Sequence, residues 1–302
     1  MYFKNFDEII AHVGGKAKRA RLAVAAAADA HTLEAVLKAE AEGLIVPVLV
    51  GDEAEIRRIY ADMGKTPSDT TVIVNEPDKA EACVKAVALI RGGEADFLMK
   101  GAADTRSYLH AVVDKEKGLG CGKLMTHFVL TEVPRYHKLL SIVDTGMVPY
   151  PTLDQKKAIL LSAADVFFKL GYESVKAGVL TCVEKVNPKM PETVEAAELA
   201  RMAEEGELPG IKVAGPISYD CAMSREIAEL KGYENEVAGD ADILLFPNIH
   251  AGNILGKCLT VTCGAQMAGF IVGTICPVVM TSRGSSMEEK YHSIVLAAGI
   301  TG

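Results

Sequence analysis

Short apolar runs alternate with longer amphipathic stretches along most of the chain. The apolar runs are rich in β-branched residues, and the stretches between them carry apolar residues at helical spacing. This alternation predicts parallel β-strands joined by crossover helices, which is the α/β class. The expected strands are Val46–Asp52, Thr70–Asn75, Asp96–Gly101, Lys138–Gly146, Lys176–Cys182, Lys212–Ser218, Ala241–Asn248 and Pro277–Gly284.

Two further segments bear on the organisation of these elements. Two prolines precede Thr152, and Gln155 follows three positions later, which is capping-box spacing. We therefore expect a long helix to begin there, with a boundary between lobes close by. The Ala-rich stretch 21–43 is interpreted as a buried strand leading into a helix, although its periodicity leaves this open.

Composition and charge narrow the classes of function. With 302 residues and 49% hydrophobic content, the chain can bury one large core or two smaller ones, and we expect two lobes. The net charge of -8 argues against binding to nucleic acid or to an anionic membrane, so an anionic ligand needs a local cluster of donors. No apolar run approaches the roughly 20 residues that span a bilayer, and the N-terminus lacks a signal-peptide pattern, so a cytoplasmic location is expected.

Cysteine and histidine spacing gives no sign of a metal site. The seven cysteines include no CxxC pair, and we expect reduced thiols that lie mostly in the core. The histidines form no short-spaced cluster with them, so no structural metal is expected. The glycine-rich segment 118–123 follows a charged stretch rather than a strand and is expected to be a loop.

Three expected strands end in residues suited to binding an anion, at the edge where parallel sheets collect ligands. The first end has Lys100 and Gly101, followed by Asp104, Thr105 and Arg106; glycine lets the backbone approach an anion, while lysine supplies charge. An ordinary strand-to-helix turn explains the same residues.

At the second end, Asn248 closes a strand, Ala251 and Gly252 are expected to form a tight turn, and Asn253 opens a helix whose backbone donors suit a phosphate or carbonyl oxygen. Plain helix capping is the alternative interpretation.

The third strand end is the most informative. Ser282 and Arg283 offer a hydroxyl and a bidentate fork that suit a phosphate or a developing oxyanion. Glu288 and Glu289 lie one turn downstream. Each of them also has capping-box spacing, Glu289 to Ser286 and Glu288 to the serine before it, so capping and catalysis both remain open for the two glutamates.

In this order, the segments resemble the phosphate acetyltransferase and phosphate butyryltransferase family along nearly the whole chain, and its butyryl-type branch more closely. The matching stretches are Leu98–Gly101, Val186–Thr193, Ala214–Ser224, Lys231–Tyr233, Val237–Lys257 and Pro277–Ala297.

The resemblance implies two α/β lobes like those of the isocitrate and isopropylmalate dehydrogenases, with largely parallel sheets, a cleft between the lobes and a homodimer. We expect residues 1–148 and 276–302 in the first lobe and 149–275 in the second. Ser282 and Arg283 match the family's phosphate and oxyanion site. Glu289, or else Glu288, matches the family's base, and Gly252 with Asn253 matches a turn that lines the cleft. Where relatives carry Lys or Arg, this chain has His110, with Arg106 one turn earlier as a substitute.

The implied activity is reversible transfer of a short acyl group, from acetyl to butyryl, between coenzyme A and inorganic phosphate. Acyl-CoA and phosphate are then substrates, no cofactor is tightly bound, and no protein nucleophile is needed. Two alternatives stay open: a metal- and NAD-dependent hydroxy-acid dehydrogenase of the same fold, for which Asp240 and Asp242 are the only close acidic pair, and a catalytically silent CoA-binding protein.

Overall fold

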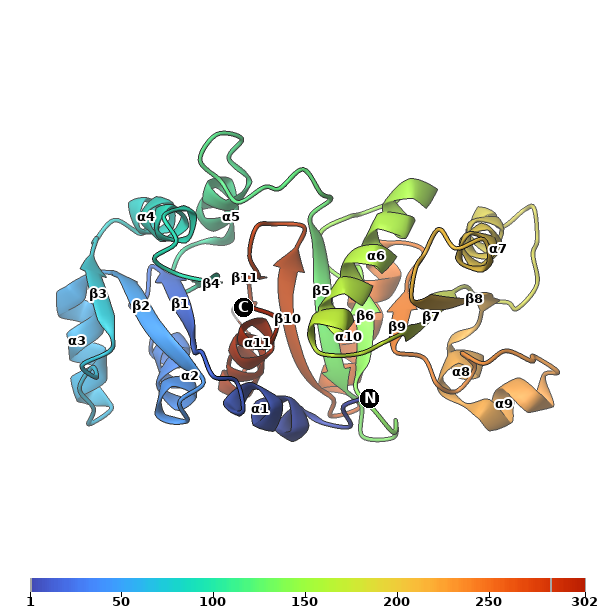
Figure 1. Cartoon of the computed structure of the whole chain (residues 1–302), viewed down its shortest axis with the longest axis horizontal. Coiled ribbons are helices and arrows are strands. Elements are labelled where there is room, and N and C mark those ends of the chain that lie inside the picture. The colour runs from blue at the N-terminus through green and yellow to red at the C-terminus, as the bar shows by residue number, and fades with distance from the viewer. Residues whose placement is uncertain (1, 283, 302) are drawn as a thin grey trace. The chain divides into compact units, whose positions relative to one another are not determined.

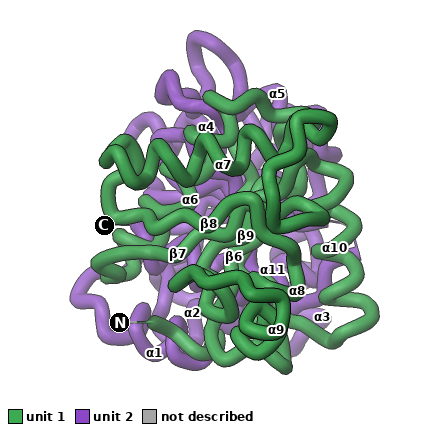
Figure 2. Tube along the Cα trace, turned by 90° about the vertical axis from the view of Figure 1, so that its right-hand side faces the viewer, with its two compact units in different colours: residues 1–6, 126–267 green, residues 7–125, 268–302 purple. Residues whose placement is uncertain are grey.

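The computed structural model describes residues 2–282 and 284–301 and has an α/β fold with mostly parallel strands (Figure 1). The expected fold class is therefore confirmed. By its internal contacts the chain divides into two compact units, which are coloured separately in Figure 2. Unit 1 comprises residues 1–6 and 126–267, and unit 2 comprises residues 7–125 and 268–302.

Unit 2 contains a sheet with the strand order β3-β2-β1-β4-β11-β10. Its neighbouring strands run parallel, apart from the antiparallel pair β10 and β11. The strands are β1 (Ala20–Ala25), β2 (Ile45–Gly51), β3 (Val72–Asn75), β4 (Phe97–Lys100), β10 (Gln266–Val272) and β11 (Val278–Val279). The helices are α1 (Phe6–Gly14), α2 (Ala30–Ala41), α3 (Glu53–Asp62), α4 (Lys79–Arg91), α5 (Thr105–Val113) and α11 (Met287–Gly299).

Unit 1 contains the strand order β5-β6-β9-β7-β8. Its pairs are parallel except for β5 with β6. The strands are β5 (Thr126–Glu132), β6 (Leu140–Val143), β7 (Val175–Leu180), β8 (Ile211–Ile217) and β9 (Ile243–Leu245). The helices are α6 (Leu153–Lys169), α7 (Pro191–Glu204), α8 (Tyr219–Met223), α9 (Arg225–Leu230) and α10 (Ile249–Val261).

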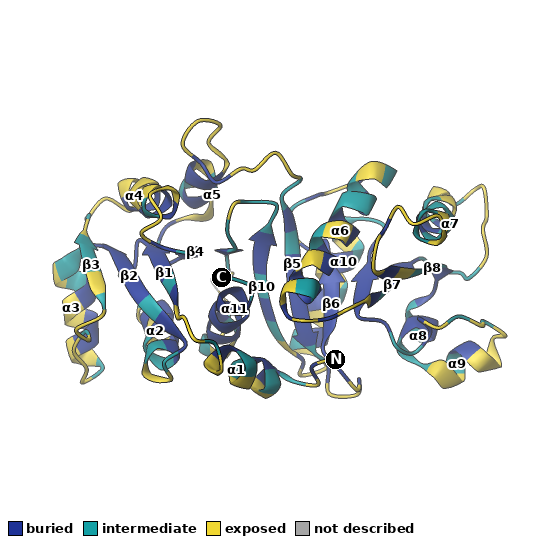
Figure 3. Ribbon diagram, in the orientation of Figure 1, coloured by how far each residue is buried: buried dark blue, intermediate teal, exposed yellow. Residues whose placement is uncertain are grey.

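Burial explains why the strands are continuous apolar runs instead of alternating ones. Helices cover the sheet within each unit, so most strands are buried on both faces while the outer faces of the helices are exposed (Figure 3). Helix α11 is an exception among the helices, because every residue from Lys290 to Gly299 is buried. It packs against α2 in unit 2.

The eight expected strands all exist, with shorter ends in several cases. The Ala-rich stretch forms β1 and then α2, whose N-cap Asp29 accepts a hydrogen bond from the backbone N–H of Thr32 at 2.8 Å. The capping box of Thr152 and Gln155 is present at the start of α6, and residues 118–123 form a loop. Strands β5 and β10 were not expected.

The contacts divide the chain after residues 6, 125 and 267. The lobe boundaries after residues 148 and 275 stay a prediction. One expectation, that of the cysteines, differs from the structure. The cysteines do not lie mostly in the core: Cys83 and Cys221 are buried, but four are exposed, and all seven are free thiols. Among the described residues, no helix is both long and apolar enough to cross a membrane.

Candidate active site

The carboxyl edge of the unit 2 sheet brings two of the three predicted strand ends together. Strands β4 and β11 are parallel neighbours, with Val279 opposite Met99, so the chain leaves both strands at the same edge. The buried hydroxyl of Tyr108 on α5 donates to the Val279 carbonyl at 3.1 Å and ties that helix to β11. Lys100, the last residue of β4, and Ser282, three residues after β11, therefore lie at the ends of adjacent strands.

The first strand end is built around Lys100, which is only 7% exposed. Its ammonium Nζ donates to the carbonyls of Gly101 at 3.2 Å and Ala103 at 3.1 Å. A Cβ on Gly101 would lie 2.3 Å from the Ala26 carbonyl oxygen, so this close approach to the end of β1 requires glycine. The lysine is a held cation at the sheet edge and not the solvated side chain of an ordinary turn.

Helix α5 begins directly after this turn. Its N-cap Asp104 accepts hydrogen bonds from the backbone N–H and the hydroxyl of Ser107 at 2.9 and 2.7 Å. Those bonds, the backbone one foremost, lower the pKa of Asp104. The predicted residues Thr105, Arg106 and His110 all lie on this helix and are exposed.

The third strand end is a loop of hydroxyl groups between β11 and α11. The Ser282 hydroxyl accepts from the Gly284 N–H at 3.1 Å, and the Ser282 N–H donates to the Ser285 hydroxyl at 3.1 Å. The Ser285 hydroxyl in turn donates to Oε1 of Glu289 at 2.7 Å. The loop is thus linked by hydrogen bonds to the first turn of α11. The predicted Arg283 lies outside the described residues.

The two glutamates of the first turn of α11 have different surroundings. Ser286 is the N-cap, and its hydroxyl accepts from the Glu289 N–H at 3.1 Å. The Glu289 carboxylate is half-buried and accepts a hydrogen bond from Ser285. Glu288 is exposed. Through Ser285, the Glu289 carboxylate is thus bonded to the loop that contains Ser282.

A second buried cation lies beside this loop and was not predicted. Lys290 is 7% exposed, and its Nζ donates to the Thr281 hydroxyl at 3.3 Å. Burial acts to raise the pKa of Asp29, the N-cap of α2, but hydrogen bonds from Thr32 and the charge of Lys290 lower it overall. The sequence contains a signal for this lysine. A positive charge in the first turn of a helix interacts unfavourably with the helix dipole, so a lysine placed there after a buried strand is unusual.

In unit 1, the predicted residues Gly252 and Asn253 lie inside helix α10. The expected tight turn at Ala251 and Gly252 is wrong, because α10 already begins at Ile249 and Asn248 is its N-cap, accepting from the Ala251 N–H at 3.1 Å. Gly252 is glycine for packing instead: a Cβ there would lie 2.7 Å from the Asp144 carbonyl oxygen and 2.9 Å from the Phe246 ring.

The loop after β6 is the partner of this helix start. The Asn253 amide donates to the Thr145 carbonyl at 3.1 Å. The buried Asp144 carboxylate accepts from the N–H groups of Gly146, Met147 and His127 at 2.7, 2.9 and 3.2 Å, and so fixes the loop. The sequence predicted this strand, but no residue at its end was among the candidate site residues, although parallel sheets collect ligands at this edge too.

His127 completes the polar group around that loop. Its Nδ1 lies 2.9 Å from the Thr145 hydroxyl. Burial lowers the pKa of His127, and the negative charge of Asp144 opposes this. The imidazole therefore favours its neutral form and can exchange a hydrogen bond with the hydroxyl in either direction.

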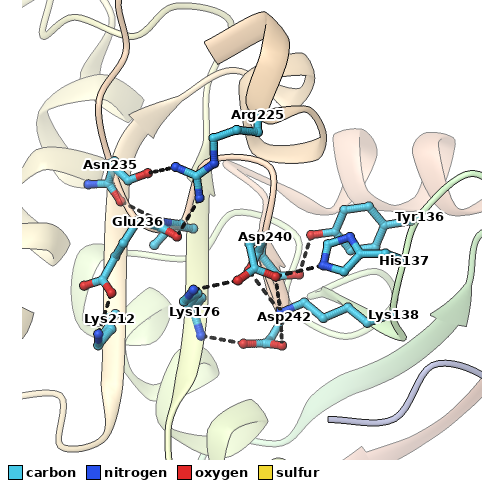
Figure 4. Close-up of polar contacts among 12 residues, drawn as sticks. Tyr136, His137, Lys138, Lys176, Lys212, Arg225, Asn235, Glu236, Asp240 and Asp242 are labelled. Carbon is cyan, nitrogen blue, oxygen red and sulfur yellow. Dashed lines mark hydrogen bonds and ion pairs between the residues drawn. The ribbon is translucent and has the colours of Figure 1, made fainter. Parts of the chain in front are cut away.

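In two acidic clusters of unit 1, lysine ammonium groups already bind the carboxylates that a metal ion would need. Among the described residues, Glu184, Asp220 and Cys221 have ligand atoms close enough to share an ion. The ammonium of Lys231 already binds both carboxylates, at 2.8 and 2.9 Å. Asp240 and Asp242, the acidic pair of the dehydrogenase alternative, bind Lys138 at 2.9 and 2.6 Å (Figure 4).

Comparison with known proteins agrees with this α/β site architecture. Residues 59–298 match the family model described as phosphate acetyl/butaryl transferase. The chain is 42% identical over 299 residues to phosphate butyryltransferase of Clostridium acetobutylicum, with 99% of both chains covered. It is 40% identical over 292 residues to phosphate acetyltransferase of Thermotoga maritima, covering 97% of this chain and 98% of the relative.

Solved structures agree with the sequence comparison. A branched-chain phosphotransacylase from Enterococcus faecalis V583 superposes with a TM-score of 0.80 at 31% identity, covering 93% of this chain and 99% of that one. The fold and the sequence as a whole are thus those of an acyltransferase enzyme. The chain belongs to the phosphate acetyl/butyryl transferase family.

Proposed function

We propose that the protein catalyses the reversible reaction of an acyl-CoA with inorganic phosphate to give an acyl phosphate and free coenzyme A. The acyl group is short, from acetyl to butyryl. In one direction a phosphate oxygen attacks the thioester carbonyl, and the thiol of coenzyme A leaves from the tetrahedral intermediate. In the other direction the thiolate attacks the acyl phosphate, and phosphate leaves.

The Glu289 carboxylate is proposed as the general base for the coenzyme A thiol. A free thiol has a pKa near 8.5, so a base is useful at neutral pH, where such catalysis contributes about 10²–10⁴-fold. The observation that carries this proposal is the bond from Ser285, because it holds the Glu289 carboxylate against the loop of Ser282 at 2.7 Å. The exposed Glu288 has no such contact with the loop among the described residues.

The phosphate and the developing oxyanion are proposed to bind at the same sheet edge. Ser282 supplies a hydroxyl, Arg283 a bidentate guanidinium, and Lys100 a buried cation. Gly101, Thr105, Arg106 and His110 line the neighbouring start of α5, and we propose that the exposed Arg106 and His110 contact the anionic parts of coenzyme A.

Other parts of the proposal rest on resemblance to the family. We propose two lobes of the isocitrate and isopropylmalate dehydrogenase type with a cleft between them, lined in the second lobe by Gly252 and Asn253. The first lobe is residues 1–148 and 276–302, and the second is residues 149–275. A homodimer and a cytoplasmic location are proposed on the same basis.

The dehydrogenase alternative is weakened by a specific observation. Its metal would need free carboxylates, but Asp240 binds His137, Lys138 and Lys176, and Asp242 binds Lys138 and the Lys176 backbone (Figure 4). The hydrogen bonds from Lys176, Lys138 and His137 outweigh the effect of burial and lower the pKa of Asp240. We therefore interpret this pair as structural.

The test is phosphate-dependent release of free thiol from acetyl-, propionyl-, butyryl- and isobutyryl-CoA. We expect Arg283→Ala and Glu289→Gln to be strongly impaired, with Glu289→Gln slower by at least about 10²-fold. Glu288→Gln is the matched control, one residue away on the same helix turn, and should stay near the wild-type rate. Equal losses in the two glutamate variants would reject the assignment of Glu289, and no release from any thioester despite binding of coenzyme A would favour the silent binder.

A further inference from the structure

Unit 1 contains a cavity that the proposed reaction does not use. Its volume is about 370 Å³, within the range of roughly 300–1,000 Å³ that is usual for small-molecule sites. Three structural elements form it: the turn after β5, helix α8, and the C-terminal end of α10. The lining residues are Val133, Pro134, Arg135, Tyr219, Met223, Leu259 and Cys263.

The cavity is separate from the polar group of unit 1 described above. Strand β6 has the turn of Val133–Arg135 before its first residue and Asp144 after its last. Helix α10 has Asn253 in its first turns, whereas Cys263 follows its last residue, about 15 Å further along at the helical rise. The cavity and the Asp144 loop therefore lie at opposite ends of the same two elements.

The walls of the cavity are mostly apolar and continuous with the core of unit 1. Leu259 is 3% exposed and Val133 is 8% exposed, and both belong to the core cluster against which Tyr219 and Met223 also pack. An apolar wall of this kind favours the hydrocarbon part of a ligand.

Two polar side chains belong to the lining of this apolar space. Among the described residues, neither the Arg135 guanidinium nor the Tyr219 hydroxyl has a hydrogen-bond or ion-pair partner. Burial raises the pKa of Tyr219, with a smaller effect of the nearby Cys263 and Cys258 thiols, so its hydroxyl stays protonated at neutral pH and can donate. Both groups thus offer donors.

The turn that presents Arg135 is fixed in place. The next residue, Tyr136, donates from its hydroxyl to the Ala241 carbonyl at 2.8 Å. His137 binds Asp240 at 2.9 Å, and the 5%-exposed Lys138 binds both Asp240 and Asp242 (Figure 4). The guanidinium therefore extends from a rigid turn, which lowers the entropy lost when a ligand binds.

We propose that this cavity binds a small apolar carboxylate, with its chain against Leu259 and Met223 and its carboxylate on Arg135 and Tyr219. A guanidinium pairs with a carboxylate through two parallel hydrogen bonds. A single arginine matches a single negative charge, while the net charge of -8 disfavours polyanions at a site with no second cation in its lining. The class is therefore a monocarboxylate with an aliphatic or aromatic body.

The test uses the exposed thiol of Cys263 as a reporter within the lining. The full-length protein is alkylated with and without hexanoate, and modification is read by mass spectrometry at each cysteine. Hexanoate should slow alkylation of Cys263 and leave the exposed Cys182 and Cys121, which do not line the cavity, unchanged. 1-Hexanol, which has the same chain but no charge, should protect Cys263 much less.

Arg135→Gln is the decisive variant, because Arg135 is exposed and its loss leaves the core intact. It should weaken protection by hexanoate about tenfold, as expected for loss of a hydrogen bond to a charged group, and leave phosphate-dependent thiol release unchanged. Arg201 is an exposed arginine on α7. In Arg201→Gln, hexanoate should protect Cys263 as well as it does in the wild type.

Three results would overturn the proposal: no protection of Cys263 by hexanoate, equal protection by 1-hexanol, or unchanged protection in Arg135→Gln. A fourth would be an alkylation rate of Cys263 that falls as protein concentration rises without hexanoate, because a second copy would then cover the cavity. These outcomes do not depend on whether the protein transfers acyl groups, so the two proposals fail separately.

Discussion

The hydroxyl of Ser285 donates a hydrogen bond to Oε1 of Glu289 across 2.7 Å, while its oxygen accepts from the backbone N–H of Ser282 at 3.1 Å. One side chain thus joins the proposed base to the loop proposed to bind phosphate. The adjacent Ser286 has a different task, since its hydroxyl accepts from the Glu289 N–H and caps α11. Ser285 therefore positions the Glu289 carboxylate, while Ser286 caps the helix.

The first prediction uses this pair of serines. Ser285→Ala should lower kcat/KM for phosphate-dependent thiol release by about tenfold, because one hydrogen bond to a charged group is lost, with little change in thermal stability. Ser286→Ala should show the reverse pattern, with a loss of about 1 kcal/mol of stability from the missing cap and a smaller kinetic effect. Kinetics and thermal unfolding of both variants check this; the same loss of activity in both would contradict it.

Helix α10 offers a test of the close contact between Gly252 and the loop after β6. In Gly252→Ala the new Cβ meets the Asp144 carbonyl oxygen, which cannot move freely, so we expect a loss of about 1–3 kcal/mol in the free energy of unfolding. In Gly256→Ala, on the same helix, the nearest atom is the Ile142 Cδ1 at 3.2 Å, the tip of a flexible side chain.

For Gly256→Ala, the better helix propensity of alanine offsets that contact, so its stability should lie within about 1 kcal/mol of the wild type. Urea unfolding of the two variants makes the comparison. If Gly256→Ala were the more damaged of the two, the packing account of Gly252 would be rejected.

Buried His292 predicts that stability depends on pH in mildly acidic solution. Burial, with a contribution from Lys38, lowers the pKa of His292 from 6.5 to about 4. Between pH 6.5 and about 4, His292 is therefore protonated in the unfolded chain but neutral in the folded protein. Its contribution to the free energy of unfolding is fully present above pH 6.5 and is lost as the pH decreases toward 4. The loss attributable to this residue is about 3 kcal/mol.

Urea unfolding between neutral pH and pH 4 measures this slope. In His292→Asn the slope should flatten, whatever the change in stability at neutral pH. The exposed His31→Asn is the control and should keep the wild-type slope. An unchanged slope in His292→Asn would mean that other groups cause the acid sensitivity.

The Asp240 cluster predicts a second loss of stability, at lower pH. The folded-state pKa of Asp240 is lowered, so its contribution is present above the unfolded value of 3.8 and is lost as the pH falls below it. Asp240→Asn should cost about 2 kcal/mol at neutral pH, and the difference from wild type should narrow as the pH falls below 3.8.

Asp165→Asn provides the matched comparison, because Asp165 forms an exposed pair with Lys169 on α6. Such pairs contribute about 0–1 kcal/mol, so this variant should resemble the wild type at every pH. Urea titrations at several pH values compare the three proteins. A difference for Asp240→Asn that does not change with pH would contradict the assignment.

The periodicity of the sequence predicted the buried parallel strands well, because strands covered on both faces are continuous apolar runs. It missed β5 and β10, which form the antiparallel pairs with β6 and β11, because no helix separates either strand from its partner along the chain. The ends of β9 and β11 were placed too far along, since apolar residues such as Phe246 continue past the last strand pairing.

The site was predicted unevenly for a physical reason. Residues such as Lys100 and Ser282 follow strands directly, so a rule about strand ends finds them. Contacts to their neighbours in the chain come from elsewhere. Ala26, after β1, lies against Gly101, Tyr108 of α5 donates to Val279, and Lys290 of α11 donates to Thr281. Spacing along one segment cannot report contacts made between segments, and the glutamates could be separated only by the direction of the Glu289 carboxylate.

The late position of β11 and α11 in the chain has a consequence for how the protein is made. Strand β11 lies between β4 and β10 in the sheet of unit 2, and α11 is buried almost entirely against that unit. Synthesis proceeds from the N-terminus, so residues 126–267 leave the ribosome as one block before the final residues that unit 2 requires. The loop of Ser282 and the carboxylate of Glu289 are therefore assembled after unit 1, and a nascent chain that stalls before residue 278 has made all of unit 1 but none of this part of the proposed active site.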